Sequence, residues 1–163
     1  MNLIVATDEN WGIGNGNKLL THLSGDLKYF KEKTMGKVVV MGRKTLESLP
    51  GGKPLPGRTN IVLTRSQELD PGCKVCHNME ELLEELKKYN TDDVFVVGGA
   101  KVYRDLLGLC DKLYITKIMK KFEADAYLDD IDKKPEFKKV WESTAQVEGD
   151  TQYVFTQYDR VKE

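Results

Sequence analysis

Short apolar runs alternate with amphipathic segments along the chain. Apolar or β-branched runs bounded by Gly, Pro, Asn or Asp predict buried strands at residues 3–7, 37–41, 59–64, 93–97 and 113–119. Amphipathic patterns predict helices at residues 26–34 and 79–89. Two further short helices are expected at residues 44–49 and 100–107, each directly after a strand and a glycine. Strands joined by crossover helices imply an α/β fold with a mainly parallel sheet and helices on both faces. Ligands of such sheets bind beyond the carboxyl ends of the strands.

The pattern changes after Asp125. Residues 139–146 and 151–158 flank Glu148-Gly149-Asp150, which predicts an antiparallel hairpin that closes one edge of the sheet. No linker rich in Pro or Ser, no repeat and no low-complexity segment interrupts the sequence. We therefore expect residues 1–163 to form a single domain.

Composition narrows the classes of partner. The 163 residues include 25 Lys and Arg against 26 Asp and Glu, with the two signs interspersed. Nucleic acid and anionic membranes need a positive surface, so neither is expected as a partner. The apolar runs are far shorter than the ~20 residues of a membrane helix. The first residues read as a strand and not as a signal peptide, so we expect a cytoplasmic protein.

The cysteines do not point to a disulfide framework or to a metal. Cys73, Cys76 and Cys110 are an odd number. Residues 73–77 match the C-x-x-C-H string of covalent haem attachment, but such attachment goes with export. A short strand and a turn before the next helix is the preferred interpretation. Cys110 and His22 show no ligand spacing, so no metal is predicted.

Three predicted strands end in groups suited to an anion. Gly98-Gly99-Ala100-Lys101 begins a helix with free backbone N–H groups, Gly42-Arg43-Lys44-Thr45 adds two cations and a hydroxyl, and Thr64-Arg65-Ser66 ends a third strand. Each alone is equally typical of a tight turn with surface charge. On one sheet edge, the three predict a phosphate-binding face. The missing acidic residue in Thr64-Arg65-Ser66 favours a 2′-phosphate over a free ribose hydroxyl.

Residues 12–17 and Asp26 each allow two interpretations. The glycine-dense residues 12–17 depart from the dinucleotide fingerprint at Asn17, so they are either a plain turn or a mobile lid beside a site. Asp26 lies one helical turn from Phe30, so its carboxylate can face an apolar cleft. Alternatively, Ser24 is the N-cap of the helix and Asp26 complements the helix dipole.

Seven segments, met in order along the chain, carry a resemblance to a known family. They lie at residues 3–6, 12–14, 26–30, 40–48, 54–60, 98–103 and 113–116, and include Asp26-Leu27-x-x-Phe30 and Gly98-Gly99-x-x-Val102-Tyr103. Together they resemble bacterial dihydrofolate reductase. The resemblance implies an eight-stranded, mostly parallel sheet with four helices and a C-terminal antiparallel hairpin. It implies a monomer that also binds antifolate inhibitors.

The resemblance also implies a reaction. NADPH would reduce 7,8-dihydrofolate to 5,6,7,8-tetrahydrofolate, with a hydride passing from C4 of the nicotinamide to C6 of the pterin and a proton reaching N5. By the family pattern, Asp26 holds the pterin 2-amino group and N3, with Thr116 beside it. Burial is expected to raise the pKa of Asp26 by desolvation, which keeps protonated acid available.

The remaining site residues follow from the same pattern. Arg58 would pair with the glutamate α-carboxylate of folate. The other substrate-binding residues implied are Ile4, Val5, Leu27, Phe30, Leu49, Lys53 and Leu55. A cis peptide is implied between Gly98 and Gly99. The cofactor-binding residues implied are Ala6, Ile13, Gly14, Asn17, Lys18, Leu19, Gly42, Arg43, Lys44, Thr45, Leu63, Thr64, Arg65, Ser66, His77, Val97, Gly98, Gly99, Ala100, Lys101, Val102 and Tyr103. For His77, plain surface exposure is equally open.

The chain departs from the family pattern just before Asp26. Leu20-Thr21 stands where a Pro-Trp pair is common, so the indole N–H that would order a water near the pterin is replaced by a hydroxyl. Two alternatives stay open. One is the related NADPH-dependent pyrimidine reductase of riboflavin synthesis, although the H-x-E and P-C-x-x-C motifs of its usual deaminase companion do not occur. The other is a non-catalytic pterin- or nucleotide-binding module, against which the retained Asp26 speaks.

Overall fold

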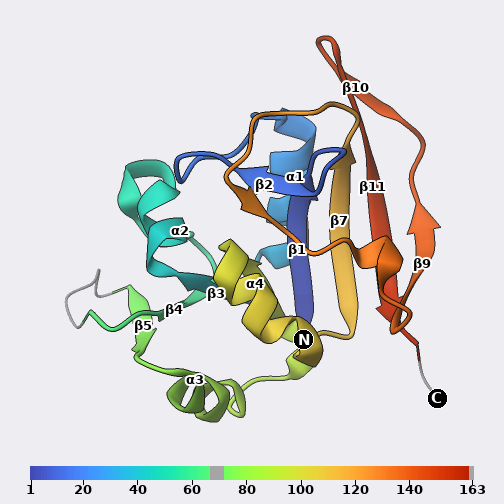
Figure 1. Ribbon diagram of the computed structural model, residues 1–163. Helices are drawn as coiled ribbons and strands as arrows, with labels where there is room; N and C mark the ends of the chain where they lie inside the picture. Colours follow the sequence, from blue (N-terminus) through green and yellow to red (C-terminus); the bar gives the residue numbers. More distant parts are fainter. Residues whose placement is uncertain (67–71, 162–163) are drawn as a thin grey trace.

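The computed structural model describes residues 1–66 and 72–161. Nine strands form one sheet in the order β10-β11-β7-β1-β6-β3-β4-β5, and β9 also pairs with β11 (Figure 1). Neighbours from β7 to β5 run parallel, whereas β7, β9 and β10 each pair antiparallel with β11. The strands are β1 Asn2–Thr7, β3 Val38–Gly42, β4 Thr59–Leu63, β5 Cys73–Cys76, β6 Val94–Gly98, β7 Lys112–Ile118, β9 Phe137–Glu142, β10 Gln146–Glu148 and β11 Thr151–Arg160. The prediction of a mostly parallel sheet that ends in an antiparallel hairpin is confirmed. The described sheet has nine strands where the resemblance implied eight, because the predicted strand at residues 139–146 is divided into β9 and β10.

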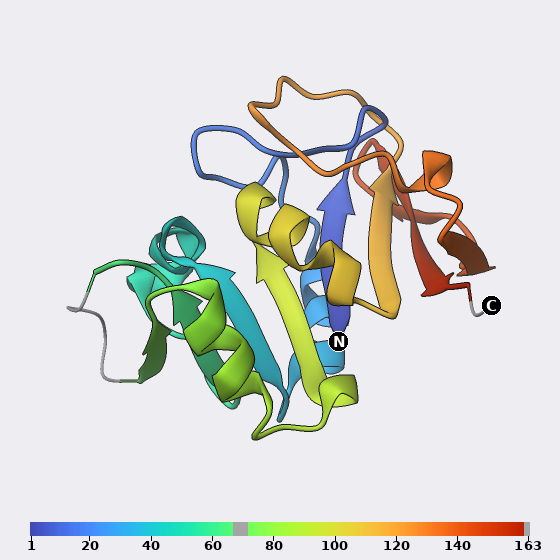
Figure 2. The ribbon, with the colours of Figure 1, turned by 60° about the horizontal axis from the view of Figure 1, so that its bottom comes forward.

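The helices cover both faces of the sheet, as predicted. They are α1 Ser24–Thr34, α2 Arg43–Ser48, α3 Met79–Leu86 and α4 Ala100–Leu106. Helices α3 and α4 lie on one face of the sheet (Figure 2). They bury Leu82 and Leu106 there, together with Leu3 of β1. Helices α1 and α2 pack Phe30 and Leu46 against the other face. Because side chains alternate along a strand, β1 contributes to both layers.

The C-terminal hairpin differs from its prediction. Residues 139–146 do not form one strand, because β9 ends at Glu142 and β10 begins at Gln146. The cause lies at Ser143, whose backbone N–H donates to the Phe155 carbonyl at 2.8 Å while its hydroxyl accepts from the Phe155 N–H at 2.9 Å. Ser143 thus occupies both backbone groups of Phe155, and the following residues leave the ladder.

A small second sheet was not predicted. Strands β2, Gly12–Gly14, and β8, Ala126–Tyr127, pair antiparallel beside the carboxyl end of β1 (Figure 1). Two of the three residues of β2 are glycines, so the segment lacks the β-branched signal on which strand prediction rests. The pairing brings the predicted lid next to the segment that follows β7.

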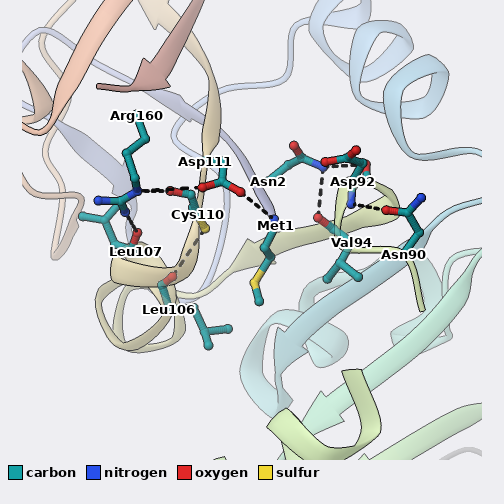
Figure 3. A network of polar contacts seen from close by, with 10 residues as sticks. All are labelled: Met1, Asn2, Asn90, Asp92, Val94, Leu106, Leu107, Cys110, Asp111 and Arg160. Carbon is teal, nitrogen blue, oxygen red and sulfur yellow. Dashed lines mark hydrogen bonds and ion pairs between the residues drawn. The ribbon is translucent and has the colours of Figure 1, made fainter. Parts of the chain in front are cut away.

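Polar side chains anchor the first and last strands. The Asn2 amide donates to the carbonyls of Asp92, at 2.9 Å, and Val94, at 3.1 Å (Figure 3). The Arg160 guanidinium donates to the carbonyls of Cys110 and Leu107, both at 3.0 Å. These bonds fix the entries of β6 and β7, so the opposite ends of those strands are held in register. Within residues 1–66 and 72–161, no helix is both long and apolar enough to cross a membrane.

Candidate active site

Asp26 lies in the first turn of α1 and turns toward β7. The Thr116 hydroxyl donates to its Oδ1 at 2.6 Å, although the two residues lie 90 positions apart. The alternative interpretation, in which Ser24 caps this helix, is wrong: the N-cap position is Leu23, and it offers no side-chain acceptor. Asp26 therefore faces the interior of the site and does not serve as a solvated dipole partner.

A pocket opens beside the Asp26 carboxyl group. Its lining comes from β1, α1, the end of β7 and the lid segment, which we define as residues 11–19, together with the two residues that follow the lid. The lining residues include Ala6, Ile13, Leu20, Thr21, Leu27 and Ile118. The structure thus brings the predicted Ala6, Ile13, Leu19 and Leu27 to Asp26. The pocket is apolar apart from Asp26 and the Thr21 hydroxyl.

The electrostatics of Asp26 follow from this setting. Burial raises the pKa of its carboxyl group above the ordinary 3.8, and the hydrogen bond from Thr116 opposes the rise. No positively charged side chain of the described chain contributes to the shift. A carboxyl group without a cationic partner holds its proton to higher pH, and it has lone pairs beyond the one that Thr116 uses. The site can therefore orient an N–H donor and hold a proton.

We expect the substitution Asp26→Asn to stabilise the fold at neutral pH. The pKa of Asp26 in the folded state lies above its unfolded value near 3.8. The contribution of Asp26 to the free energy of unfolding is therefore complete below the unfolded pKa and is lost as pH rises through the raised folded pKa. The asparagine cannot ionise, and its oxygen still accepts from Thr116. Calorimetry should give a higher Tm for the variant at about pH 8 and equal values near the unfolded pKa. A lower Tm for the variant at alkaline pH would contradict the assignment.

Arg58 lies at the other end of α1. Its Nη1 donates to the hydroxyl of Thr34, the last residue of the helix, at 3.2 Å, and its Nε donates to the Pro56 carbonyl at 2.9 Å. Eight residues separate Asp26 from Thr34, which at the α-helical rise is roughly 12 Å. Partial burial lowers the pKa of Arg58, but the guanidinium stays charged. The two ends of α1 therefore carry a proton-holding acid and an oriented cation.

Apolar side chains line the surface between these ends. Phe30, Leu49 and Leu55 are partly buried against the cluster that contains Ile4, so the structure brings these predicted residues together. Lys53 is exposed in the same segment. Val5 is different, because its side chain packs in the cluster on the opposite face of the sheet. Only its backbone belongs to the β1 segment beside the site, a consequence of the alternation along a strand.

The three strand ends that make up the predicted phosphate-binding face lie side by side in the fold. Strands β3, β4 and β6 are neighbours and end at Gly42, Leu63 and Gly98. The peptide between Gly98 and Gly99 is cis, as the resemblance implied. A Cβ on Gly98, whose φ is +136°, would lie 3.0 Å from the Thr45 hydroxyl oxygen. The end of β6 and the start of α2 therefore lie in close contact, and Gly98 fits there because it has no side chain.

The side chains on this face have varied partners. Thr64, Lys44, Arg65 and Ser66 stand at or near its surface, whereas Arg43 binds Glu47 at 2.9 Å and Lys101 binds Asp105 at 2.8 Å. The His77 ring lies 3.1 Å from a Glu81 oxygen, after the neighbouring strand β5. Ala100 begins α4, and Val97 is partly buried against the α1 layer. Val102 and Tyr103 are buried in the core, where the Tyr103 hydroxyl donates to the Ile4 carbonyl at 2.8 Å.

Hydrogen bonds hold the lid segment on both sides of the site. The Gly16 N–H donates to Asp125 at 3.0 Å, and the Gly14 carbonyl accepts from the Asp125 N–H at 3.0 Å. The Asn17 amide donates to the Lys44 carbonyl at 2.9 Å. Lys18 and Leu19 follow with exposed side chains. The lid therefore spans from the Asp26 pocket to the phosphate-binding face, which supports its interpretation as a lid over its interpretation as a plain turn.

Asp8 holds the base of the lid and was missed by sequence reasoning. Its side chain is 4% exposed and accepts from the N–H groups of Asn10, Gly12 and Phe122 at 2.8 to 2.9 Å. The substitution Asp8→Ala leaves three donors without this acceptor and should cost about 2 to 4 kcal/mol of unfolding free energy. Asp8→Asn keeps one oxygen and should cost less.

Urea denaturation of these variants tests the role of Asp8. The matched control is Asp125→Ala, because Asp125 accepts from the same lid but is exposed to solvent. We expect it to cost less than about 1 kcal/mol. Equal losses for Asp8→Ala and Asp125→Ala would show that the buried carboxylate has no special role.

Other site residues were missed for identifiable reasons. Ile118 lines the pocket two positions after Thr116, so the period of two along a strand could have placed it there. Asp125 and Glu148 contact the site over more than 100 positions, and nothing in the local sequence marks them. No group of His, Cys, Asp and Glu in the described ranges could hold a metal ion.

Comparisons with known proteins agree with this geometry. Residues 1–160 match the family model of dihydrofolate reductase. The dihydrofolate reductase of Bacillus subtilis is 41% identical over 133 residues, which cover 81% of this chain and 77% of that protein. The solved dihydrofolate reductase of Enterococcus faecalis, complexed with NADP(H) and RAB-propyl, superposes with a TM-score of 0.87. It is 38% identical and is matched over 99% of this chain and 96% of its own.

Longer relatives also match. The bifunctional dihydrofolate reductase-thymidylate synthase of Glycine max is 38% identical over 178 residues. That match covers 98% of this chain but 33% of the soybean protein. The chain therefore spans about a third of such bifunctional relatives, and most or nearly all of the bacterial ones.

Proposed function

The chain belongs to the dihydrofolate reductase family, and we propose that it reduces 7,8-dihydrofolate to 5,6,7,8-tetrahydrofolate with NADPH. The pair of groups at the two ends of α1 carries this proposal. Asp26, bonded to Thr116, suits the amino group and ring N–H of a pterin. Arg58, oriented by Thr34 and Pro56, suits a carboxylate roughly 12 Å away along the helix. The apolar surface of Phe30, Leu49 and Leu55 suits an aromatic spacer between them.

The residues of the phosphate-binding face fit NADPH. Hydroxyls and cations surround the ends of β3 and β4 at residues 43–45 and 64–66, and no carboxylate occurs in Thr64-Arg65-Ser66. A 2′-phosphate needs such donors, whereas a free ribose hydroxyl is usually bound by an acidic residue. Gly98 and Gly99 carry no side chain, so a pyrophosphate can approach the backbone between β6 and α4 without displacing one. When bound, NADPH supplies the hydride from C4 of its nicotinamide to C6 of the pterin.

Asp26 has two tasks in this proposal. It orients the pterin through its 2-amino group and N3, and it favours arrival of a proton at N5 by keeping a protonated fraction at higher pH than a solvated aspartate would. Thr116 holds the carboxyl group in place, and the lid residues Ile13 and Leu19 exclude water from the pocket. The overall change is one hydride and one proton added across the C6–N5 double bond.

We also propose a domain organisation, an oligomeric state, a cellular location and a class of inhibitors for the protein. Residues 1–163 act as one domain, because strands from both halves of the chain share one sheet. The protein works as a monomer in the cytoplasm, where Cys76 and Cys110 stay reduced. Antifolate inhibitors bind the Asp26 pocket, since they carry the same amino-heterocycle donors as the substrate.

The test is the oxidation of NADPH with and without dihydrofolate, repeated with NADH. We expect NADPH to be consumed only when dihydrofolate is present, and NADH to be a poor donor because it lacks the 2′-phosphate. Mass spectrometry should identify tetrahydrofolate in an amount equal to the NADPH consumed. A folded protein that binds both molecules without turnover would point to the non-catalytic module. Turnover of a ribosylaminopyrimidine instead would point to the riboflavin-type reductase.

A further inference from the structure

The first turn of α1 lacks a cap from its own sequence. The N-cap residue Leu23 has no side-chain acceptor, and Asp26, the acidic residue of the first turn, is turned away toward Thr116. The N–H groups of Ser24 and Gly25 have no partner within the helix, as in any helix start. An 11-residue helix that carries the substrate acid therefore depends on an acceptor from elsewhere.

Glu148 supplies that acceptor from the opposite end of the sequence. It is the last residue of β10, at the turn into β11. Its Oε1 accepts from the Ser24 N–H at 2.9 Å, from the Ser24 hydroxyl at 2.6 Å and from the Gly25 N–H at 3.4 Å, while Oε2 accepts from the Ser24 N–H at 3.0 Å. These bonds also lower the pKa of Glu148, so the carboxylate is ionised at neutral pH.

A second contact from the same hairpin reaches the same turn. The Tyr153 side chain is 4% exposed, and its hydroxyl would lie 2.2 Å from a Cβ built on Gly25. Tyr153 belongs to a cluster with Leu23 and Ile118, and both of these line the Asp26 pocket. The hairpin therefore contacts the start of α1 twice. The Glu148 carboxylate accepts from its N–H groups, and the Tyr153 phenol packs against its backbone.

We infer that the Glu148 side chain caps the N-terminus of α1 from the neighbouring hairpin and thereby positions Asp26 for the substrate. A carboxylate at a helix N-terminus satisfies the free N–H groups and complements the helix dipole, so it fixes where the helix starts and how its first turn is rotated. Asp26 lies two residues beyond Ser24, so a looser first turn moves the Asp26 carboxyl group relative to Thr116. This inference rests on the proposed role of Asp26 in binding dihydrofolate.

The kinetic test compares Glu148→Ala, Glu148→Gln and a matched control. For Glu148→Ala we expect KM for dihydrofolate to rise about fivefold, the ratio expected for a lost N-cap. KM for NADPH should not change, since its site lies on other elements. Glu148→Gln retains an oxygen at the Oε1 position and should stay within about twofold of the wild type, because a neutral acceptor still caps the helix. The control Asp150→Ala removes a carboxylate from the same turn that binds Lys120 instead, and should change neither constant.

Three kinetic outcomes would overturn the inference. They are an unchanged KM for dihydrofolate in a folded Glu148→Ala variant, equal rises for both substrates, and a Glu148→Gln variant as impaired as Glu148→Ala. A wild type without any turnover would refute the proposed function instead.

Amide hydrogen exchange tests the cap without turnover, and its first measurement needs only the wild type. In the wild type, the Ser24 and Gly25 amides should exchange on the order of tenfold or more slower than free amides, because each donates to a charged acceptor. The same amides should lose that protection in Glu148→Ala and keep it in Asp150→Ala. Unprotected Ser24 and Gly25 amides in the wild type would overturn the inference, even where Glu148→Ala fails to fold.

Discussion

Asp26→Asn should lower kcat for dihydrofolate about 100-fold or more, the usual range for loss of a positioned acid or base. The asparagine keeps the size of the side chain and an oxygen for the Thr116 hydroxyl. It has no acidic proton and cannot accept from both pterin donors in the manner of a carboxylate. The steady-state rate at saturating NADPH and saturating dihydrofolate gives this change in kcat.

The companion measurements for Asp26→Asn separate chemistry from folding. NADPH affinity should stay at the wild-type value, because the phosphate-binding face lies at the ends of β3, β4 and β6. The Tm should be equal or higher, since burial disfavours the ionised carboxylate. A stable variant with full turnover on dihydrofolate would remove Asp26 from the mechanism.

Arg58→Leu should raise KM for dihydrofolate about 10- to 100-fold with little change in kcat, because a charge-assisted contact is worth about 1.5 to 3 kcal/mol. The guanidinium is already oriented by Thr34 and Pro56, so little ordering is needed when a carboxylate binds. The predicted partner is the glutamate α-carboxylate, far from the reacting atoms. The loss should therefore fall on binding.

A truncated substrate makes the Arg58 prediction specific. Dihydropteroate lacks the glutamate, so wild type and Arg58→Leu should bind it equally. The exposed Lys53 in the same segment offers a comparison, and Lys53→Met should change KM only a few-fold because solvent screens its charge. If Arg58→Leu impaired both substrates equally, Arg58 would serve the fold and not the glutamate.

The elements that a local pattern defines were predictable from the sequence. Residues 3–7 and 113–119 read as strands because their apolar runs are bounded by turn residues, and they pair as β1 and β7 with Ala6 opposite Thr116. The ends of β3, β4 and β6 meet because parallel strands share a carboxyl edge. The pairing of Asp26 with Thr116 came from the family resemblance, since local patterns do not specify a contact over 90 positions.

The features that escaped prediction are set by long-range or non-repeating contacts. Ser24 looks like an N-cap in the sequence, yet it is the first residue of the helix. The acceptor for its N–H group is Glu148, which lies 124 positions away in the sequence. The break at Ser143 depends on its partner Phe155, which the period of residues 139–146 does not show. Val5 illustrates a different limit, because the resemblance gave its place in the site while strand alternation decides which face its side chain takes.

The departure at Leu20-Thr21 now has a structural setting. Both residues line the Asp26 pocket, and Thr21 brings a hydroxyl where the family pattern often has an indole. A hydroxyl can both donate and accept, whereas an indole N–H only donates. The Thr21 hydroxyl can therefore take either role in a hydrogen bond beside Asp26.

The most direct test of the account is the pH dependence of a single turnover of bound dihydrofolate by bound NADPH. The wild-type rate of hydride transfer should fall as pH rises through the pKa of Asp26, which burial holds above the ordinary 3.8. The Asp26→Asn rate should be about 100-fold lower and should not show that transition. A wild-type rate that is flat across that pH range, or the same transition in Asp26→Asn, would contradict the claim that the buried Asp26 carboxyl group governs the reduction.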